Sequence, residues 1–182
     1  MKKKILRIVL AVVILLVFWL IRSSSMLSRV SIQEKQVDPF VMVYADYVGD
    51  YKNVYAPMDS VYNKLLKEDG ISTTKGVGIY YDNPEEVAVE KLRSKVGCIL
   101  DEKDMKALPD LKKKYKVQEF KPMDAIVVEF PFRSRMSIIS GVMKVYPAIR
   151  KYAEEKNLGS REMIEIYDTP GQKIVYIMPI SK

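Results

Sequence analysis

The sequence of 182 residues contains no histidine and a single cysteine, Cys98. Without histidine there is no imidazole general base and no His-ligated metal site. A lone cysteine excludes an internal disulfide, a thiolate zinc cluster and a Cys/His nucleophile pair. Cys98 lies in the apolar run from Val96 to Leu100, so we expect it to be a small buried hydrophobe. We therefore expect neither a bound metal nor a cofactor.

Most of the chain also lacks an excess of basic charge. The formal net charge is +7, but residues 23–182 carry 25 basic and 23 acidic side chains. Such a balance is ordinary for a soluble domain, so we expect no nucleic-acid partner. We interpret the one dense basic cluster, Lys112 to Lys116, as a solvated face. The remaining five basic residues lie in or beside one apolar segment at the N-terminus: Lys2, Lys3, Lys4, Arg7 and Arg22.

That apolar segment is long enough to consider as a membrane span. Residues 5–21 contain one polar side chain, Arg7, and as a helix they would extend about 26 Å, slightly less than the ~30 Å hydrocarbon core. We expect residues 1–22 to be a single-pass transmembrane anchor that contacts lipid through residues 5–21. A cleavable signal peptide is the alternative, because Ser23 to Ser25 are small. Trp19 and Arg22 at the end of the segment favour a retained anchor.

The charges on either side of the segment predict its orientation. Lys2, Lys3, Lys4 and Arg7 precede most of it, and only Arg22 and Arg29 follow closely. By the positive-inside rule the N-terminus stays in the cytoplasm. The rest of the chain is then extracytoplasmic, which means periplasmic in a bacterium.

Beyond the anchor we expect a linker over residues 23–38 and one domain over residues 39–182. The pattern of apolar residues predicts a strand, a helix and two strands, and then the same order again after a charged connector at 101–121 with a short helix at 105–114. The expected elements are a strand at 40–48, a helix at 54–66, strands at 77–81 and 95–100, a strand at 125–132, a helix at 137–156, and strands at 161–167 and 173–178.

A repeated turn supports this duplication. Tyr81-Asp82-Asn83-Pro84 recurs as Tyr167-Asp168-Thr169-Pro170, 86 residues later, at the end of the third element of each half. A shared motif in a shared order of elements predicts a tandem repeat. The predicted fold class is therefore α+β, with two tandem strand-helix-strand-strand (SHS2) units and antiparallel sheets.

Alignment of the two halves on this turn places Glu165 against Ile79. Strand alternation puts Met163, Glu165 and Tyr167 on one face. A carboxylate on an apolar face is costly to bury unless it binds something, and burial would raise its pKa. Glu165 is thus the first candidate for a binding residue or, in an enzyme, a catalytic one. The alternative is that this face is wet and Glu165 is solvated.

Tyrosine is abundant, with 12 residues, and aromatic faces beside a carboxylate suit a cationic or amphipathic aromatic ligand. Core packing is the alternative role for each tyrosine. Glu129, on the strand before Phe130-Pro131-Phe132, is a second candidate carboxylate. The tyrosines that lie on or beside predicted elements are Tyr47, Tyr51, Tyr80, Tyr146, Tyr167 and Tyr176.

Two stretches carry a family resemblance. Tyr80 to Pro84, continued by Lys91 to Gly97, and later Ile164-Glu165-Ile166-Tyr167, resemble the GyrI-like effector-binding domains over about residues 40–180. The resemblance implies paired SHS2 units whose cleft binds amphipathic, often cationic, small molecules, with Glu165 as the pocket carboxylate. Some members of the superfamily are hydrolases. Val145-Tyr146-Pro147-Ala148 is similar to membrane-anchored animal proteins of the superfamily.

Three hypotheses about function follow. The first is a membrane-anchored module that binds an amphipathic or cationic small molecule between its repeats. The second is a hydrolase of a strained or electrophilic small molecule, with Glu165 as general base on a bound water. The third is a membrane-tethered adaptor with a protein partner, for which we expect a large exposed apolar patch.

Overall fold

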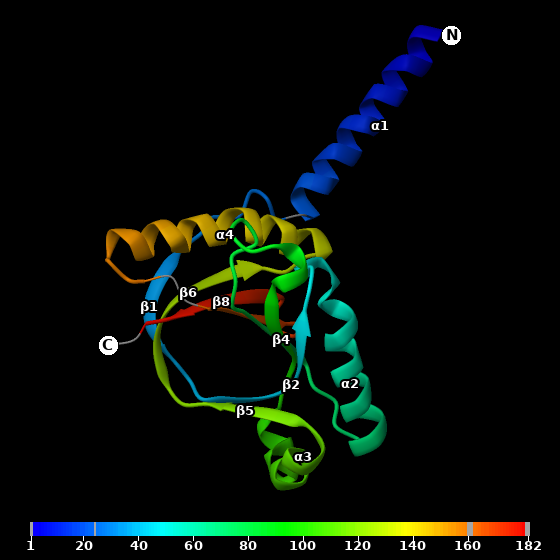
Figure 1. The fold of residues 1–182 in the computed structure, drawn as a ribbon. Coiled ribbons are helices and arrows are strands. Elements are labelled where there is room, and N and C mark those ends of the chain that lie inside the picture. The colour runs from blue at the N-terminus through cyan, green and yellow to red at the C-terminus, as the bar shows by residue number, and fades with distance from the viewer. Residues whose placement is uncertain (1, 24, 160–161, 181–182) are drawn as a thin grey trace.

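The computed structural model describes residues 2–23, 25–159 and 162–180. The described residues exclude Ser24, which belongs to the signal-peptide alternative, and Arg161, at the start of a predicted strand. Helix α1 (Lys2–Ser23) projects from a domain built on one curled sheet of eight antiparallel strands (Figure 1). The order of strands in the sheet is β1-β6-β8-β7-β3-β4-β2-β5.

The elements follow the predicted order with two additional strands. Short 3-10 helices lie between the longer elements at Tyr51–Asn53, Val89–Lys91 and Glu102–Ala107. The longer elements are β1 (Ile32–Val37), β2 (Phe40–Val48), α2 (Tyr55–Asp69), β3 (Lys75–Tyr80), β4 (Arg93–Ile99), α3 (Leu108–Lys114), β5 (Lys116–Phe120), β6 (Met123–Pro131), α4 (Arg135–Glu155), β7 (Met163–Asp168) and β8 (Lys173–Pro179).

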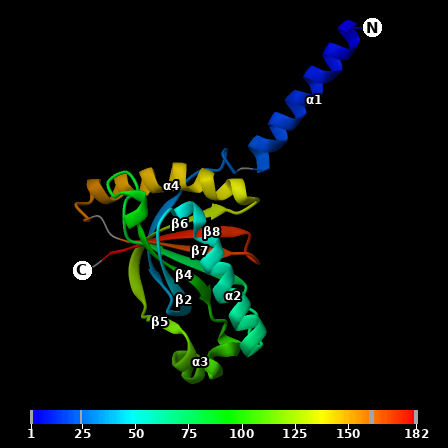
Figure 2. The same cartoon turned by 45° about the vertical axis from the view of Figure 1, so that its right-hand side comes forward.

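The tandem SHS2 prediction is confirmed. The first unit is β2-α2-β3-β4 and the second is β6-α4-β7-β8. Strands β3 and β7 pair antiparallel in the middle of the sheet and so join the two units into one continuous surface. Helices α2 and α4 both pack on the same face of this sheet (Figures 1 and 2).

Local sequence explains how the two long helices form. Met58, Val61 and Leu65 recur at helical spacing and give α2 its buried face. The helix ends at Gly70, whose φ of 68° is left-handed and costs little in glycine. In α4 the hydroxyl of Ser134 accepts a hydrogen bond from the Met136 amide and caps the N-terminus.

The predicted linker is wrong over residues 32–37. This segment is strand β1, which pairs with β6 at one edge of the sheet. Its sequence, Ile-Gln-Glu-Lys-Gln-Val, gives little apolar signal because the four central side chains are exposed. Strand β5, at the opposite edge, was likewise missed inside the predicted connector, whereas the short helix expected there is present as α3. Edge strands bury few side chains, so their pattern is weak.

Candidate functional site

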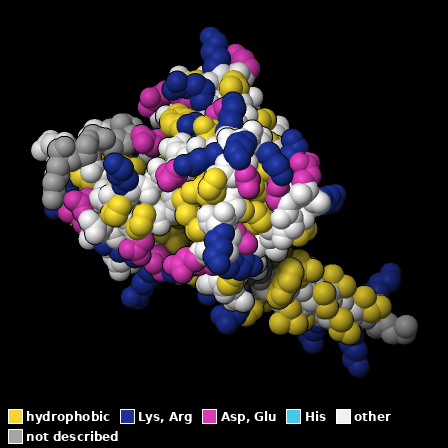
Figure 3. All heavy atoms as spheres, turned by 90° about the horizontal axis from the view of Figure 1, so that it is seen from below, with side chains coloured by type: hydrophobic (Ala, Val, Ile, Leu, Met, Phe, Trp, Pro, Cys, Tyr) yellow, Lys and Arg dark blue, Asp and Glu magenta, His cyan; other side chains and the backbone are white. Residues whose placement is uncertain are grey.

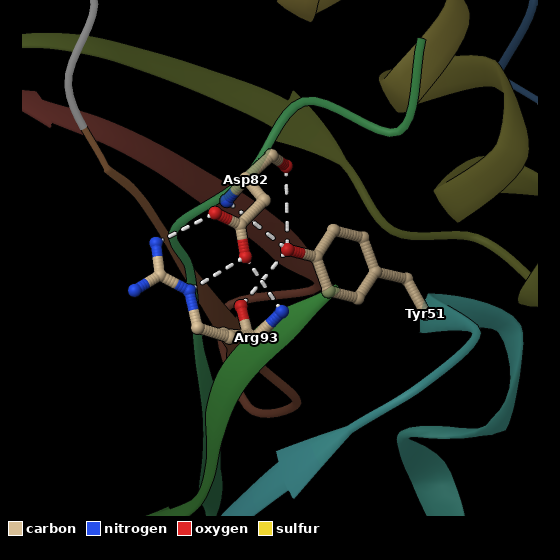
Figure 4. A network of polar contacts seen from close by, with 3 residues as sticks. All are labelled: Tyr51, Asp82 and Arg93. Carbon is tan, nitrogen blue, oxygen red and sulfur yellow. Dashed lines mark hydrogen bonds and ion pairs between the residues drawn. The ribbon is translucent and has the colours of Figure 1, made fainter. Parts of the chain in front are cut away.

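In each repeat, the aspartate of the repeated Tyr-Asp turn holds the connection to the next strand. Asp82 follows β3 and pairs with the Arg93 guanidinium at 2.7 Å, and its carboxylate also accepts a hydrogen bond of 2.7 Å from the Arg93 amide (Figure 4). The Tyr51 hydroxyl donates to the backbone carbonyl of Arg93 at 2.9 Å and accepts from the backbone amide of Asp82 at 3.2 Å (Figure 4). In the second copy the carboxylate of Asp168 accepts from the Gly171 amide at 2.9 Å. Both aspartates therefore hold the connection between two strands.

Glu165 lies on the helix-covered face of β7 and is 2% exposed. Met163 and Tyr167 point to the same face and are also buried, whereas Ile164 packs in a separate apolar cluster. The predicted alternation along this strand is confirmed, and the wet-face alternative for Glu165 is wrong.

Two tyrosine hydroxyls hold the carboxylate of Glu165. Tyr146, from α4, donates to Oε1 at 2.6 Å, and Tyr167, two residues along β7, donates to Oε2 at 2.5 Å. The hydroxyl of Tyr80, from β3, lies 3.1 Å from that of Tyr167. Among the described residues no lysine or arginine pairs with Glu165. The site is thus a buried acid in a cage of three tyrosines contributed by both repeats.

Burial raises the pKa of Glu165, and the hydrogen bonds from Tyr146 and Tyr167 partly oppose this shift because they favour the charged form. Their lengths are those of charge-assisted O–H···O⁻ bonds. Burial and the nearby Glu165 charge raise the pKa of Tyr80, Tyr146 and Tyr167. The tyrosines therefore remain protonated and serve as donors.

The alignment of the two halves is wrong at Glu165 and Ile79, because these residues point to opposite faces of the sheet. Across the β3–β7 pair, Glu165 lies opposite Gly78, and Ile79 lies opposite Ile164. Ile79 packs with Ile164 on the other face of the sheet. A shift of one residue reverses the face of every side chain in a strand, so the turn motif alone could not fix the register.

Two glycines shape the site and were missed by sequence reasoning. A Cβ on Gly78 would lie 2.7 to 2.9 Å from the outer ring atoms of Tyr80, so only glycine lets that ring lie across β3 toward Tyr167. A Cβ on Gly141 of α4 would lie 2.0 Å from the hydroxyl oxygen of Tyr176. In the described structure this hydroxyl is buried without a hydrogen-bond partner. No signal in a single sequence distinguishes these glycines from others.

The remaining predicted residues are spread more widely. Tyr176 lies opposite Glu165 on β8, and its ring makes an edge contact with Tyr146. Tyr51 contacts the cage only through the ring of Tyr80, at 4.9 Å between centroids. Tyr47 lies apart, and its hydroxyl donates to the Asp50 carbonyl at 3.4 Å.

Glu129 is not part of the cage. It is exposed on β6 and pairs with Lys173 at 2.9 Å and with Lys35 at 3.2 Å. These two lysines lower the pKa of Glu129. Within β6 it alternates with Val128 and Phe130, which belong to the core cluster under α4, so Glu129 points to the other face.

A cleft of about 450 Å³ opens beside the cage, between α2 and the start of α4. Tyr55, Asp59 and Tyr62 line it from α2, and Ile138 lines it from α4. Tyr167 forms part of its wall and also holds Glu165, so the acid lies one side chain behind the cleft. Among the described residues no group of three or more acidic or cysteine side chains could hold a metal ion.

Two SHS2 units paired in one sheet are the fold that the GyrI-like resemblance predicted. No family model matches the chain. The C-terminal domain of EcmrR is similar in fold, with a TM-score of 0.58 and 12% identity over 84% of this chain and 98% of that domain. EcmrR in a complex with DNA gives a TM-score of 0.57 and 14% identity over 92% of this chain and 69% of that chain.

In sequence the chain is similar to Testis-expressed protein 264. The mouse homolog is 29% identical over 140 residues, which cover 74% of this chain and 42% of that protein. The human protein is 30% identical over 114 residues, covering 59% of this chain and 36% of that protein. The chain therefore spans less than half the length of either relative.

Proposed function

We propose that this chain is a membrane-anchored module that binds an amphipathic or cationic small molecule in the cleft between its two repeats. The observation that carries the proposal is the buried Glu165, which has tyrosine donors but no basic partner among the described residues. Burial of an unpaired carboxylate is costly for a fold. A cationic ligand beside the carboxylate would offset that cost, and a cation would in turn be drawn to a charge in a poorly solvated site.

The walls of the cleft support this ligand chemistry. Tyr55, Tyr62 and Tyr167 offer aromatic surface, on which a cation or a flat aromatic group can rest. Asp59 adds a second negative charge at the mouth, although Lys75 also lines the cleft. The volume of about 450 Å³ is in the range of small-molecule sites. We propose that Glu165 supplies its charge from behind Tyr167, and that Tyr80 and Tyr146 orient it.

The hydrolase alternative has less support in the geometry. A general base must reach a water molecule or the proton that it abstracts. Both carboxylate oxygens of Glu165 accept hydrogen bonds from tyrosines, and the side chain is almost fully enclosed. We therefore propose that the site binds a ligand and does not hydrolyse it.

Helix α1 is the proposed anchor. It is long and apolar enough to cross a membrane, and its apolar side chains are all exposed. Figure 3 shows it as a hydrophobic rod with basic side chains near its free end. We propose residues 1–22 as a single-pass anchor and, because β1 belongs to the sheet, residues 32–182 as the binding domain. The domain is extracytoplasmic in this proposal because the basic residues precede the span.

A thermal-shift titration of the full chain in detergent tests the binding proposal. A cationic aromatic dye such as rhodamine 6G should raise the unfolding temperature in a dose-dependent way, because a ligand that binds only the folded state stabilises it by about 2.7 kcal/mol at a hundredfold excess over Kd. A neutral aromatic of similar size is the matched control. If a panel of cationic aromatics gives no shift, the proposal is wrong.

A further inference from the structure

The end of α1 is fastened to the first half of α4. The Lys144 ammonium donates to the backbone carbonyls of Met26 and Ser28, at 2.8 and 2.5 Å. The Arg133 guanidinium, just before α4, donates to the Arg22 carbonyl at 3.0 Å. These contacts satisfy carbonyls at and after the C-terminus of α1, where basic side chains are favoured by the helix dipole.

Ser25 completes this attachment from inside. Its side chain is 1% exposed, and its hydroxyl donates to the Pro131 carbonyl at 3.0 Å and lies 3.0 Å from the Ser137 hydroxyl. Its φ of 59° turns the chain sharply at the point where it leaves the helix. Residues 25–28, which follow α1, are therefore docked on the domain, and we call them the stem.

The outer face of α4 is apolar only in the half that the stem contacts. Met136, Ile139, Val142 and Met143 are 44 to 61% exposed and lie within one side of the helix at spacings of three, four and seven. Beyond Pro147 the exposed positions are charged instead: Arg150, Lys151, Glu154 and Glu155. A surface helix normally presents a polar outer face, so an apolar one indicates a partner.

The apolar stripe continues onto the stem. Leu27 is 75% exposed and Met26 is 42% exposed, next to the carbonyls that Lys144 holds. In Figures 1 and 2, α4 lies across the side of the domain from which α1 projects. The opposite side, seen from below in Figure 3, carries basic and acidic side chains interspersed with hydrophobic ones.

The two chain segments that carry the stripe have charges of one sign. Residues 21–30 and 131–145 contain no aspartate or glutamate. Exposed apolar side chains surrounded by basic ones are typical of helices that lie in the interface of a bilayer with anionic lipids. The basic residues of these two segments are Arg22, Arg29, Arg133, Arg135 and Lys144.

We propose that α4 and the stem form a second membrane contact: Met136, Ile139, Val142, Met143 and Leu27 insert into the headgroup boundary of the bilayer that α1 spans. This inference rests on the proposed anchoring by α1. The stem fixes the distance, because Met26 follows Arg22 by four residue steps, which can extend at most about 14 Å. Since Met26 is bonded to Lys144, the stripe cannot leave the vicinity of the bilayer while the stem stays docked.

The contact would also set the pose of the binding domain. Tyr146 of α4 holds Glu165, and Ile138 of α4 lines the cleft, so the helix that rests on the membrane is a wall of the proposed site. An amphipathic ligand dissolved in the interface would then reach the cleft laterally from the lipid. A protein partner or a second copy on the same stripe would instead leave the domain free of the bilayer surface.

Depth-dependent quenching tests the proposal on the full chain in vesicles of phosphatidylcholine with phosphatidylglycerol. Single cysteines are placed by Ile139→Cys and Met143→Cys on α4, Lys112→Cys on the distant α3, and Val12→Cys within α1, all in a Cys98→Ala background. Each is labelled with an environment-sensitive dye and exposed, in separate vesicles, to lipids spin-labelled near the headgroup or deep in the acyl chains. We expect strong quenching at positions 139 and 143, and none at position 112.

The outcomes separate the two proposals. If position 12 is quenched by spin labels deep in the acyl chains but positions 139 and 143 behave like position 112, the anchor stands and the surface contact is wrong. If position 12 is not quenched, the anchoring proposal fails, and the surface contact falls with it. A disulfide-linked dimer of the Ile139→Cys variant, without quenching, would assign the stripe to a second copy and overturn the proposal.

Discussion

Tyr146 of α4 and Glu165 of β7 are joined by a hydrogen bond of 2.6 Å between the phenol and a carboxylate oxygen that is shielded from solvent. The second oxygen accepts from Tyr167, so the carboxylate joins the long helix to the central strands. Loss of either donor would leave a buried acceptor unsatisfied. We therefore expect the acid to be important both for the packing of α4 and for the proposed binding.

The pH dependence of stability tests the buried state of Glu165. Its pKa is raised in the folded protein, so its contribution to stability is fully present below its ordinary pKa and is lost as the pH rises through the folded value. Glu165→Gln has no such proton to lose. The Tm of this variant minus that of the wild type should therefore increase from about pH 4 to about pH 8, as measured by thermal unfolding.

Glu129→Gln is the matched control with the opposite sign. Lys173 and Lys35 lower the pKa of Glu129, so ionised Glu129 stabilises the wild type above the ordinary pKa. The Tm of Glu129→Gln minus that of the wild type should therefore decrease as the pH rises. The effect should be small, because the pair is exposed. A pH-independent Tm difference for Glu165→Gln would contradict the assignment.

Gly78→Ala should destabilise the domain by about 1–3 kcal/mol, the usual cost of overpacking. The added methyl would lie 2.7 to 2.9 Å from the outer atoms of the Tyr80 ring, which is buried and lies within 3.1 Å of the Tyr167 hydroxyl. Gly159→Ala, in open space, is the control and should change stability by less than about 0.5 kcal/mol. Equal stability of the two variants in urea unfolding would show that Tyr80 can move freely.

The Asp82 turn should depend more on its backbone contact than on its ion pair. Asp82→Ala removes the acceptor of the Arg93 amide and should cost about 1–2 kcal/mol. Arg93→Ala keeps that amide and loses only a guanidinium that is 66% exposed, so it should cost less than Asp82→Ala. Chemical denaturation of both variants checks the order. A larger cost for Arg93→Ala would show that the ion pair dominates.

The orientation of the anchor can be tested by protease protection. We expect the domain to be shielded when protease is added from the cytoplasmic side of sealed vesicles, because Lys2, Lys3, Lys4 and Arg7 hold the N-terminus in the cytoplasm. The same vesicles opened with detergent show whether the folded domain is cleavable. Digestion in sealed vesicles from the cytoplasmic side would contradict the predicted topology.

Elements with strong periodicity could be predicted from the sequence. The central strands and both long helices bury one regular face, and Tyr81-Asp82 and Tyr167-Asp168 mark corresponding turns. For Glu165, its place between Met163 and Tyr167 left burial and solvation open as alternatives, and the structure shows burial. Edge strand β1 could not be found in this way, because pairing with β6 and not side-chain burial creates it.

The cage was only partly predictable, because its geometry depends on register and on close approach. Pairing of Gly78 with Glu165 is a property of the assembled sheet, which an alignment of the two turns does not predict. Tyrosines on β3, β7 and α4 were candidates, but the sequence could not separate them by role. Tyr146 donates to the acid, Tyr80 contacts only its other donor, Tyr167, and Tyr47 lies apart.

The central claim is that Glu165 provides the charge for a cationic ligand, and a paired titration tests it most directly. The full chain and its Glu165→Gln and Glu129→Gln variants are titrated with rhodamine 6G in nanodiscs of neutral lipid, with empty nanodiscs as the blank. Removal of the buried charge behind Tyr167 should weaken binding by about 1.5–3 kcal/mol for Glu165→Gln, roughly a ten- to hundredfold rise in Kd, and should leave Glu129→Gln unchanged. Equal affinity of all three proteins for a dye shown to occupy the cleft would contradict the account.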